Sequence, residues 1–238
     1  MIVTRWAMLA MAAVLILAAF GAMATDLQPS ALRVAVTAII GLLTPLFWPG
    51  RAATSARTAL RIAAWSAAAA CLAAIALRIT GNPGQPFARI LAACGMLMLI
   101  LFVTHAMAAG LEGRLRGQAG DSESAREIAG RTAAIALALL GSLPLWLGPA
   151  AELLAGRHAW IIDAVVGMSP LTHLAVASGN DLLRNQWFYQ HSNLAALQFS
   201  YPSLAELILS YGSVSLALAL IPLAPRRPRR PSDGASPT

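Results

Sequence analysis

The chain contains no lysine and few charged residues of any kind. Of its 238 residues only 11% are charged, less than half the share usual in soluble domains, whereas 58% are hydrophobic. The net charge of +7 is carried by arginine alone, a bias that fits a composition dominated by Ala, Gly, Arg and Pro. The arginines lie in short segments between apolar runs. The basic balance therefore indicates membrane topology and gives no support to nucleic-acid binding.

Motifs of the common catalytic and cofactor sites are also absent from the sequence. It has no G-x-x-x-x-G-K-[ST] pattern, no dinucleotide fingerprint, no H-E-x-x-H zinc motif and no C-x-x-C pair. Paired carboxylates within the apolar runs are missing, which leaves ion-coupled transport with little support. An intramembrane enzyme would have only His105, Asp163 and His173 to use. We therefore predict no catalytic residue, no metal ligand, no cofactor and no enzymatic activity.

Six apolar runs predict an integral membrane protein. A helix needs about 20 apolar residues to cross the hydrocarbon core, and most of the runs hold 16 to 22. Backbone amides cannot stay unpaired in lipid, so each run must be helical. The predicted spans are Trp6–Thr25, Val34–Trp48, Ile62–Leu77, Ile90–Leu111, Thr132–Ala151 and Leu207–Ala224.

The arginines also predict the orientation of the spans. Twelve of them fall in the termini and the even-numbered loops, and five fall in the odd-numbered loops. Because positively charged loops stay inside, both termini are predicted in the cytoplasm, with the protein in a bacterial inner membrane.

The first apolar run has a second interpretation. Arg5 followed by an apolar stretch that ends Ala22-Met23-Ala24 also describes a cleavable signal peptide.

Two cysteines and one histidine lie inside the apolar runs. Cys71 and Cys94 lie in the third and fourth spans, and neither has a cationic neighbour in sequence that would activate its thiol. Buried cysteine acts more often as a small apolar residue, although a disulfide between adjacent helices is compatible with the geometry. His105 lies in the fourth span, where we expect a hydrogen bond to a neighbouring helix rather than a haem ligand.

The segment between spans five and six is too apolar for a plain loop. Pro144 and Pro149 are expected to kink the fifth helix or end it early. Residues 160–177 then form two short apolar pieces, separated at Ser169-Pro170 and stopped at Gly179. We predict two re-entrant or interfacial helices here. A single span over 159–177 is the alternative, and it would place Asp163 and His173 in lipid.

An aromatic segment follows these two helices. Trp187, Tyr189 and His191 stand among polar residues, which is typical of the bilayer interface. The alternative is an external site for a ligand or partner, built on these three residues together with Asp163 and His173. The tail from Pro225 is rich in Pro, Arg and Ser, which predicts a disordered cytoplasmic segment near anionic lipid.

The layout resembles the transmembrane subunit of type-2 ABC exporters. Residues 51–61 would occupy the place of the coupling helix of that family, and 160–177 that of its re-entrant hairpin. The stretch Met168-Ser169-Pro170-Leu171-Thr172 is similar to the Asn-Pro-Leu-Thr type of sequence in the same connection. Two features of the family are missing: the amphipathic helix before span one, and an acidic stretch after span two.

We therefore predict an all-α polytopic membrane helix bundle of six transmembrane helices, with re-entrant or interfacial helices between spans five and six. The predicted function is a permease-like subunit of an ABC-type export system without an ATP site of its own. Its partners would be the lipid bilayer, a cytoplasmic ATPase subunit and a second permease copy, identical or not. The alternative is a membrane anchor or accessory subunit of a respiratory or envelope complex. The predicted parts are a five-span bundle (1–151), an external segment (152–206), the sixth span (207–224) and the tail (225–238).

Overall fold

Helices are the only regular secondary structure in the part of the chain that the structure describes, which confirms the all-α class. This computed structural model describes residues 59–61, 63–68, 71, 75, 86–119, 122–155, 160–181, 183–184 and 199–220. The first two predicted spans, the signal-peptide alternative, half of the third span and the tail lie outside these residues.

The long helix α4 (Phe87–Ala119) contains the predicted fourth span. Its part Phe87–Glu112, 26 residues long, is long and apolar enough to cross a membrane. No other single helix of the described residues meets both conditions. The apolar helix Leu204–Leu218 is too short to cross the membrane. Among the described residues, one predicted span, the fourth, is therefore a continuous helix of sufficient length.

Helix α5 (Ser122–Gly141) packs along α4 and ends earlier than predicted. The sequence 112–131 predicts a break at Gly117–Gly120, followed by a helix that begins near Ala125 and continues into the fifth span. Helix α5 does begin close to this point, at Ser122, but α4 continues to Ala119. Glu112 in α4 forms an ion pair with Arg126 of α5 at 3.4 Å. At its other end α5 stops at Gly141, so the predicted span 132–151 is not one helix.

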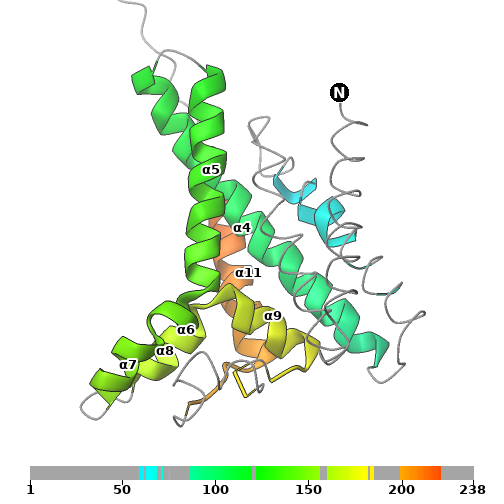
Figure 1. Cartoon of the computed structure of the whole chain (residues 1–238). Helices are drawn as coiled ribbons and strands as arrows, with labels where there is room; N and C mark the ends of the chain where they lie inside the picture. The colour runs from blue at the N-terminus through cyan, green and yellow to red at the C-terminus, as the bar shows by residue number, and fades with distance from the viewer. Residues whose placement is uncertain are drawn as a thin grey trace, which may run out of the picture.

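Two prolines explain why α5 ends early, as the sequence suggested. Pro144 falls in the first turn of a new short helix, α6 (Leu143–Trp146), and Pro149 in the first turn of α7 (Gly148–Ala155). Proline has no backbone N–H and clashes with the preceding turn, so it starts helices more readily than it continues them. The chain leaves the axis of α5 at Ser142 (Figure 1).

The remaining helices return the chain to α4. Helix α8 (Trp160–Met168) packs against α7, and α9 (Pro170–Ser178) packs against α4. Helix α11 (Leu204–Leu220) also lies along α4 and covers most of the predicted sixth span. In Figure 1 the helices α6 to α9 gather at the lower end of the bundle, away from the connection between α4 and α5.

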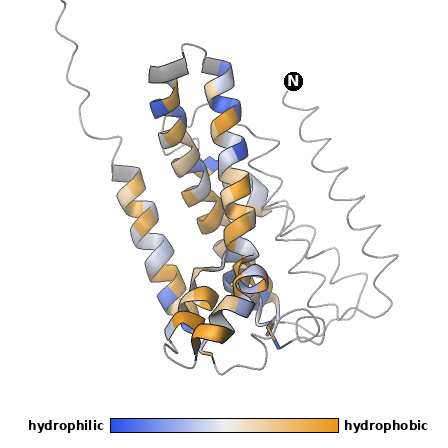
Figure 2. Ribbon diagram, turned by 60° about the vertical axis from the view of Figure 1, so that its left-hand side comes forward, coloured by the Kyte–Doolittle hydropathy of each residue, from blue (hydrophilic) through white to orange (hydrophobic). Residues whose placement is uncertain are grey.

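The main core is built around the middle of α4. Leu97 and Leu101 are almost completely buried there, and they belong to one cluster with Leu137 of α5, Leu174 of α9 and Leu207 of α11. The opposite sides of these helices carry large exposed apolar residues. In Figure 2 hydrophilic residues concentrate at the upper ends of α4 and α5, whereas apolar residues dominate below. The exposed apolar residues include Leu91, Ile135, Leu139, Leu209 and Leu216.

Candidate functional site: the break between α8 and α9

The break between α8 and α9 is the most specific polar feature of the described residues. The two helix axes are bent by 79° at the single residue Ser169. Ser169 has extended backbone angles (φ −84°, ψ 113°), and its hydroxyl accepts a hydrogen bond from the Thr172 amide, the arrangement of a helix N-cap. Pro170 then takes the first position of α9, where its missing N–H is not needed. This confirms that 160–177 forms two helices separated at Ser169-Pro170.

Side chains from α9 bind carbonyl groups in the last turn of α8. The Thr172 hydroxyl lies 2.6 Å from the Val166 oxygen and donates to it. The Nε2 atom of His173 lies 2.8 Å from the Gly167 oxygen. A carbonyl can only accept, so Nε2 carries the proton, and Nδ1 of the neutral ring accepts from the Tyr211 hydroxyl at 3.0 Å. His173 therefore connects α8, α9 and α11, and it is only 4% exposed.

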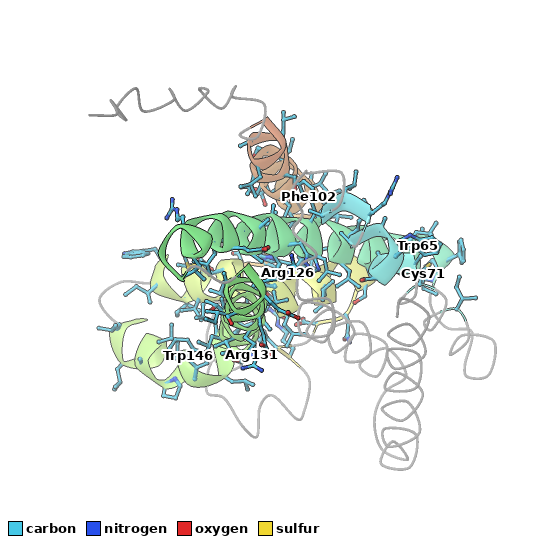
Figure 3. The ribbon with its side chains drawn as sticks, turned by 90° about the horizontal axis from the view of Figure 1, so that it is seen from above. Trp65, Cys71, Phe102, Arg126, Arg131 and Trp146 are labelled. Atoms are coloured by element: carbon cyan, nitrogen blue, oxygen red, sulfur yellow. The ribbon has the colours of Figure 1, made fainter. Side chains whose placement is uncertain are left out.

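The same break is hydrogen-bonded to the end of α5. The Ser169 hydroxyl donates to the carbonyl oxygen of Gly141, the last residue of α5, at 2.9 Å. Two further carbonyls of that last turn accept side-chain donors: Ala138 from the Ser142 hydroxyl at 2.8 Å and Leu139 from the Trp146 indole at 3.0 Å. Trp146 is labelled beside α5 in Figure 3. Carbonyls that a helix end normally presents to water are thus paired within the protein.

The break between α8 and α9 lies beside the middle of α4, as the length of α5 and the position of α9 indicate. The 20 residues of α5 rise roughly 30 Å from the α4–α5 connection, so Gly141 and its partner Ser169 lie level with the region of Ile100. At the far end of α9, Gly179 adopts φ 71° next to Arg89 in the first turn of α4. Helix α9 therefore runs from the middle of the apolar stretch of α4 back to its beginning.

A second polar cluster surrounds Asp163 and the segment before α11. The Asp163 carboxylate accepts from the Ser200 amide at 2.9 Å, and the Tyr201 hydroxyl donates to Asp181 at 2.6 Å. Burial, with a smaller effect from the hydrogen bond to Asp181, raises the pKa of Tyr201 above its usual value. Arg184 lies over the ring of Phe199 at 5.8 Å. These contacts hold residues 199–201 against α8 and join them to Asp181 and Arg184.

The structure does not bring the two described members of the predicted site to a common partner. Asp163 is exposed and binds Ser200, whereas His173 is buried and binds Gly167 and Tyr211. The other three predicted site residues, Trp187, Tyr189 and His191, lie outside the described residues. Tyr211 was missed by sequence reasoning. A hydroxyl inside a predicted span requires a partner, and that requirement was the available signal.

The break contains no arrangement for nucleophilic catalysis. The Ser169 hydroxyl donates to Gly141, and both nitrogens of His173 bind other groups. Within the described ranges, no three His, Cys, Asp or Glu residues are grouped so as to hold a metal ion. Comparison with protein-family models, with curated proteins and with solved structures finds no match for this chain.

Proposed function

We propose that the chain is an integral membrane protein in which α8 and α9 form a re-entrant hairpin that enters from the external side. The observation that carries this proposal is the set of hydrogen bonds that Ser169, Thr172 and His173 make to helix-end carbonyls, level with the middle of α4. An unpaired carbonyl in hydrocarbon costs several kcal/mol. A broken helix is therefore tolerated at that depth only if protein groups bind its ends, as they do here.

The surface of the helices supports a lipid environment. Leu209 of α11 is 72% exposed, and Ile135 of α5 and Leu216 of α11 are about 60% exposed. Such residues on several helices exceed what a soluble monomer normally presents to water. Arg114, Arg126 and Arg131 lie near the α4–α5 connection, which favours a cytoplasmic position for this end of the bundle.

As its function we propose a permease-like subunit of an ABC-type export system in a bacterial inner membrane, without an ATP site of its own. A broken helix pair on the external side, next to a kinked preceding helix, is typical of sites where a transport path opens. The proposed subunit would bind a cytoplasmic ATPase and a second permease copy. Support comes from the hairpin α8–α9 and from its resemblance in sequence to the corresponding connection of type-2 exporters.

Two experiments test this proposal at different levels. A reporter active only in the periplasm should be active when fused after Asn193 and inactive when fused after Arg116 or Arg230. Activity at Arg230 but not at Asn193 would mean that 159–177 crosses the membrane, and the hairpin would be rejected.

Purification in mild detergent should then recover an ATPase subunit. A bundle that stays intact and carries no ATPase would reject the export function while leaving the membrane topology standing.

The second candidate function is an anchor or accessory subunit of a larger membrane complex. The hydrogen bonding at the break favours this function. Ser169, Thr172 and His173 are all bound to other groups of this chain, so their side chains are engaged within the protein rather than with a transported molecule. An anchor would hold its partner through the external aromatic segment. Replacing Trp187 with Ala should then release the partner at unchanged protein level, since a buried aromatic anchor contributes about 2 kcal/mol or more. A retained partner would point to an aromatic belt at the interface.

A further inference from the structure

We propose that Cys71 and Cys94 form an intramolecular disulfide under oxidising conditions, which makes this pair a redox-sensitive link between α4 and the helical segment before it. The two thiols belong to different predicted spans, and the sequence left a disulfide between them as the less favoured alternative. This inference does not depend on the export function, but it rests on the proposed membrane topology as well as on the placement of the two side chains.

The two cysteines lie against one another in a small apolar cluster. Cys94 of α4 is 7% exposed and clusters with Ile90, and Cys71 and Ile75 pack against these two residues. This packing brings the side chains of Cys71 and Cys94 together between α4 and the helical segment before it. Cys71, labelled in Figure 3, is helical and only half-buried, and both thiols are free in this structure.

The predicted topology places both thiols near the oxidising side of the membrane. Cys71 comes seven residues before Arg78 and Cys94 five residues after Arg89, and these arginines flank the predicted external loop. At 1.5 Å per helical residue, each thiol lies about 10 Å or less from that loop. Disulfides persist in the periplasm and outside cells, whereas cytoplasmic thiols are kept reduced.

The co-reactant is a low-molecular-mass disulfide, R–S–S–R. The thiolate of Cys71, the more accessible of the two, attacks one sulfur of this disulfide, releases one R–SH and forms a mixed disulfide. The thiolate of Cys94 then attacks the Cys71 sulfur and releases the second R–SH. Each cysteine loses one proton, which leaves on one R–SH, and the two protein sulfurs are oxidised while the two R–S groups are reduced. The new bond is uncharged, which suits its apolar surroundings.

The test uses the full-length protein in native membranes. Samples are treated with oxidised glutathione or with a reductant, denatured, and alkylated with a maleimide of high mass. We expect two labels on the reduced protein and none on the oxidised protein, which should stay monomeric on a non-reducing gel. In Cys94→Ser we expect Cys71 to stop at the mixed disulfide with glutathione, and in Cys71→Ser we expect Cys94 to remain free.

A matched control moves one thiol by a single helical turn. Met98 packs against the main core rather than against Cys71, so Cys94→Ala combined with Met98→Cys should keep two cysteines and form no internal bond. Two labels on the wild-type protein even after a stronger thiol oxidant, copper phenanthroline, would overturn the proposal. Disulfide-linked dimers in place of the internal bond would overturn it as well. An internal bond in the displaced control, formed as readily as in the wild type, would remove its geometric basis.

Discussion

The rings of His173 and Tyr211 meet edge to face, with their centroids 5.5 Å apart and an angle of 79° between the ring planes. The two residues are separated by 38 positions in the sequence, and the 3.0 Å hydrogen bond between them joins α9 to α11. The same imidazole binds the end of α8 through Gly167. One side chain thus fixes the positions of three helices around the break.

The first prediction concerns this hydrogen bond. Tyr211→Phe keeps the ring contact but removes the hydroxyl that Nδ1 of His173 accepts from. We expect a loss of about 0.5–1.5 kcal/mol in the free energy of unfolding, measured by thermal or denaturant unfolding in detergent. Ser213→Ala is the control, because that exposed hydroxyl bonds only within its own helix. A Tyr211→Phe protein as stable as this control would contradict a structural role for the pair.

The second prediction concerns Thr172, whose side chain is fully buried at the break. Thr172→Val preserves the shape of the side chain but removes the 2.6 Å hydrogen bond to the Val166 oxygen, which keeps only the longer bond from the Ser169 amide at 3.4 Å. Loss of such a hydrogen bond costs about 0.5–1.5 kcal/mol, so the melting temperature should fall. Thr172→Ser keeps the hydroxyl and should lose less. A Thr172→Val protein as stable as the wild type, together with a destabilised Thr172→Ser protein, would mean that methyl packing rather than the hydrogen bond stabilises the break.

The third prediction concerns Gly179 at the end of α9. Its φ of 71° is unfavourable for residues with a Cβ, and an added Cβ would lie 3.1 Å from Nε of Arg89. Gly179→Ala should therefore destabilise the protein by about 1 kcal/mol or more. Gly212→Ala is the matched control, since a Cβ there meets nothing within 4 Å and alanine favours the helix. Adding Arg89→Ala to Gly179→Ala should relieve the contact but leave the backbone strain.

Features that depend on neighbouring residues could be predicted from the sequence. The long uncharged run of α4 predicted a helix of spanning length, and Ser169-Pro170 predicted the break, because proline cannot continue a helix. Gly179 predicted the end of α9 and takes the left-handed conformation expected of a helix stop. In each case the deciding physics lies within a few residues of the chain.

Features that depend on distant residues could not be predicted in the same way. The chain has several hydroxyls near the break, and only the packing of α5, α9 and α11 on α4 shows that Ser169 binds Gly141 and that His173 binds Tyr211. The extension of α4 beyond Gly117 was also missed, whereas a helix beginning near Ala125 was predicted and α5 begins at Ser122. Gly117 suggested a break, but the contact of the two helices, with Glu112 paired to Arg126, outweighs its low helix propensity.

The start of α11 provides a pH-dependent prediction. The Ser203 hydroxyl accepts from the Glu206 amide at 3.2 Å, and the Glu206 carboxylate accepts from the Ser203 amide at 2.7 Å. This reciprocal pair is a capping box, which stabilises the first turn of a helix. The hydrogen bond from the Ser203 amide lowers the pKa of Glu206 below its usual value of 4.5.

We therefore expect Glu206 to make stability depend on pH at acidic values. The folded protein favours the ionised carboxylate, so its contribution is complete above the unfolded pKa and is lost as the pH falls through the lowered, folded pKa. Unfolding in detergent at several pH values from neutral to acidic should show a smaller acid-induced loss in Glu206→Gln than in the wild type. Glu127→Gln is the control, because Glu127 is exposed and pairs only within its own helix, with Arg131. Equal acid sensitivity in the wild type and Glu206→Gln would mean that the capping box does not contribute to the stability of α11.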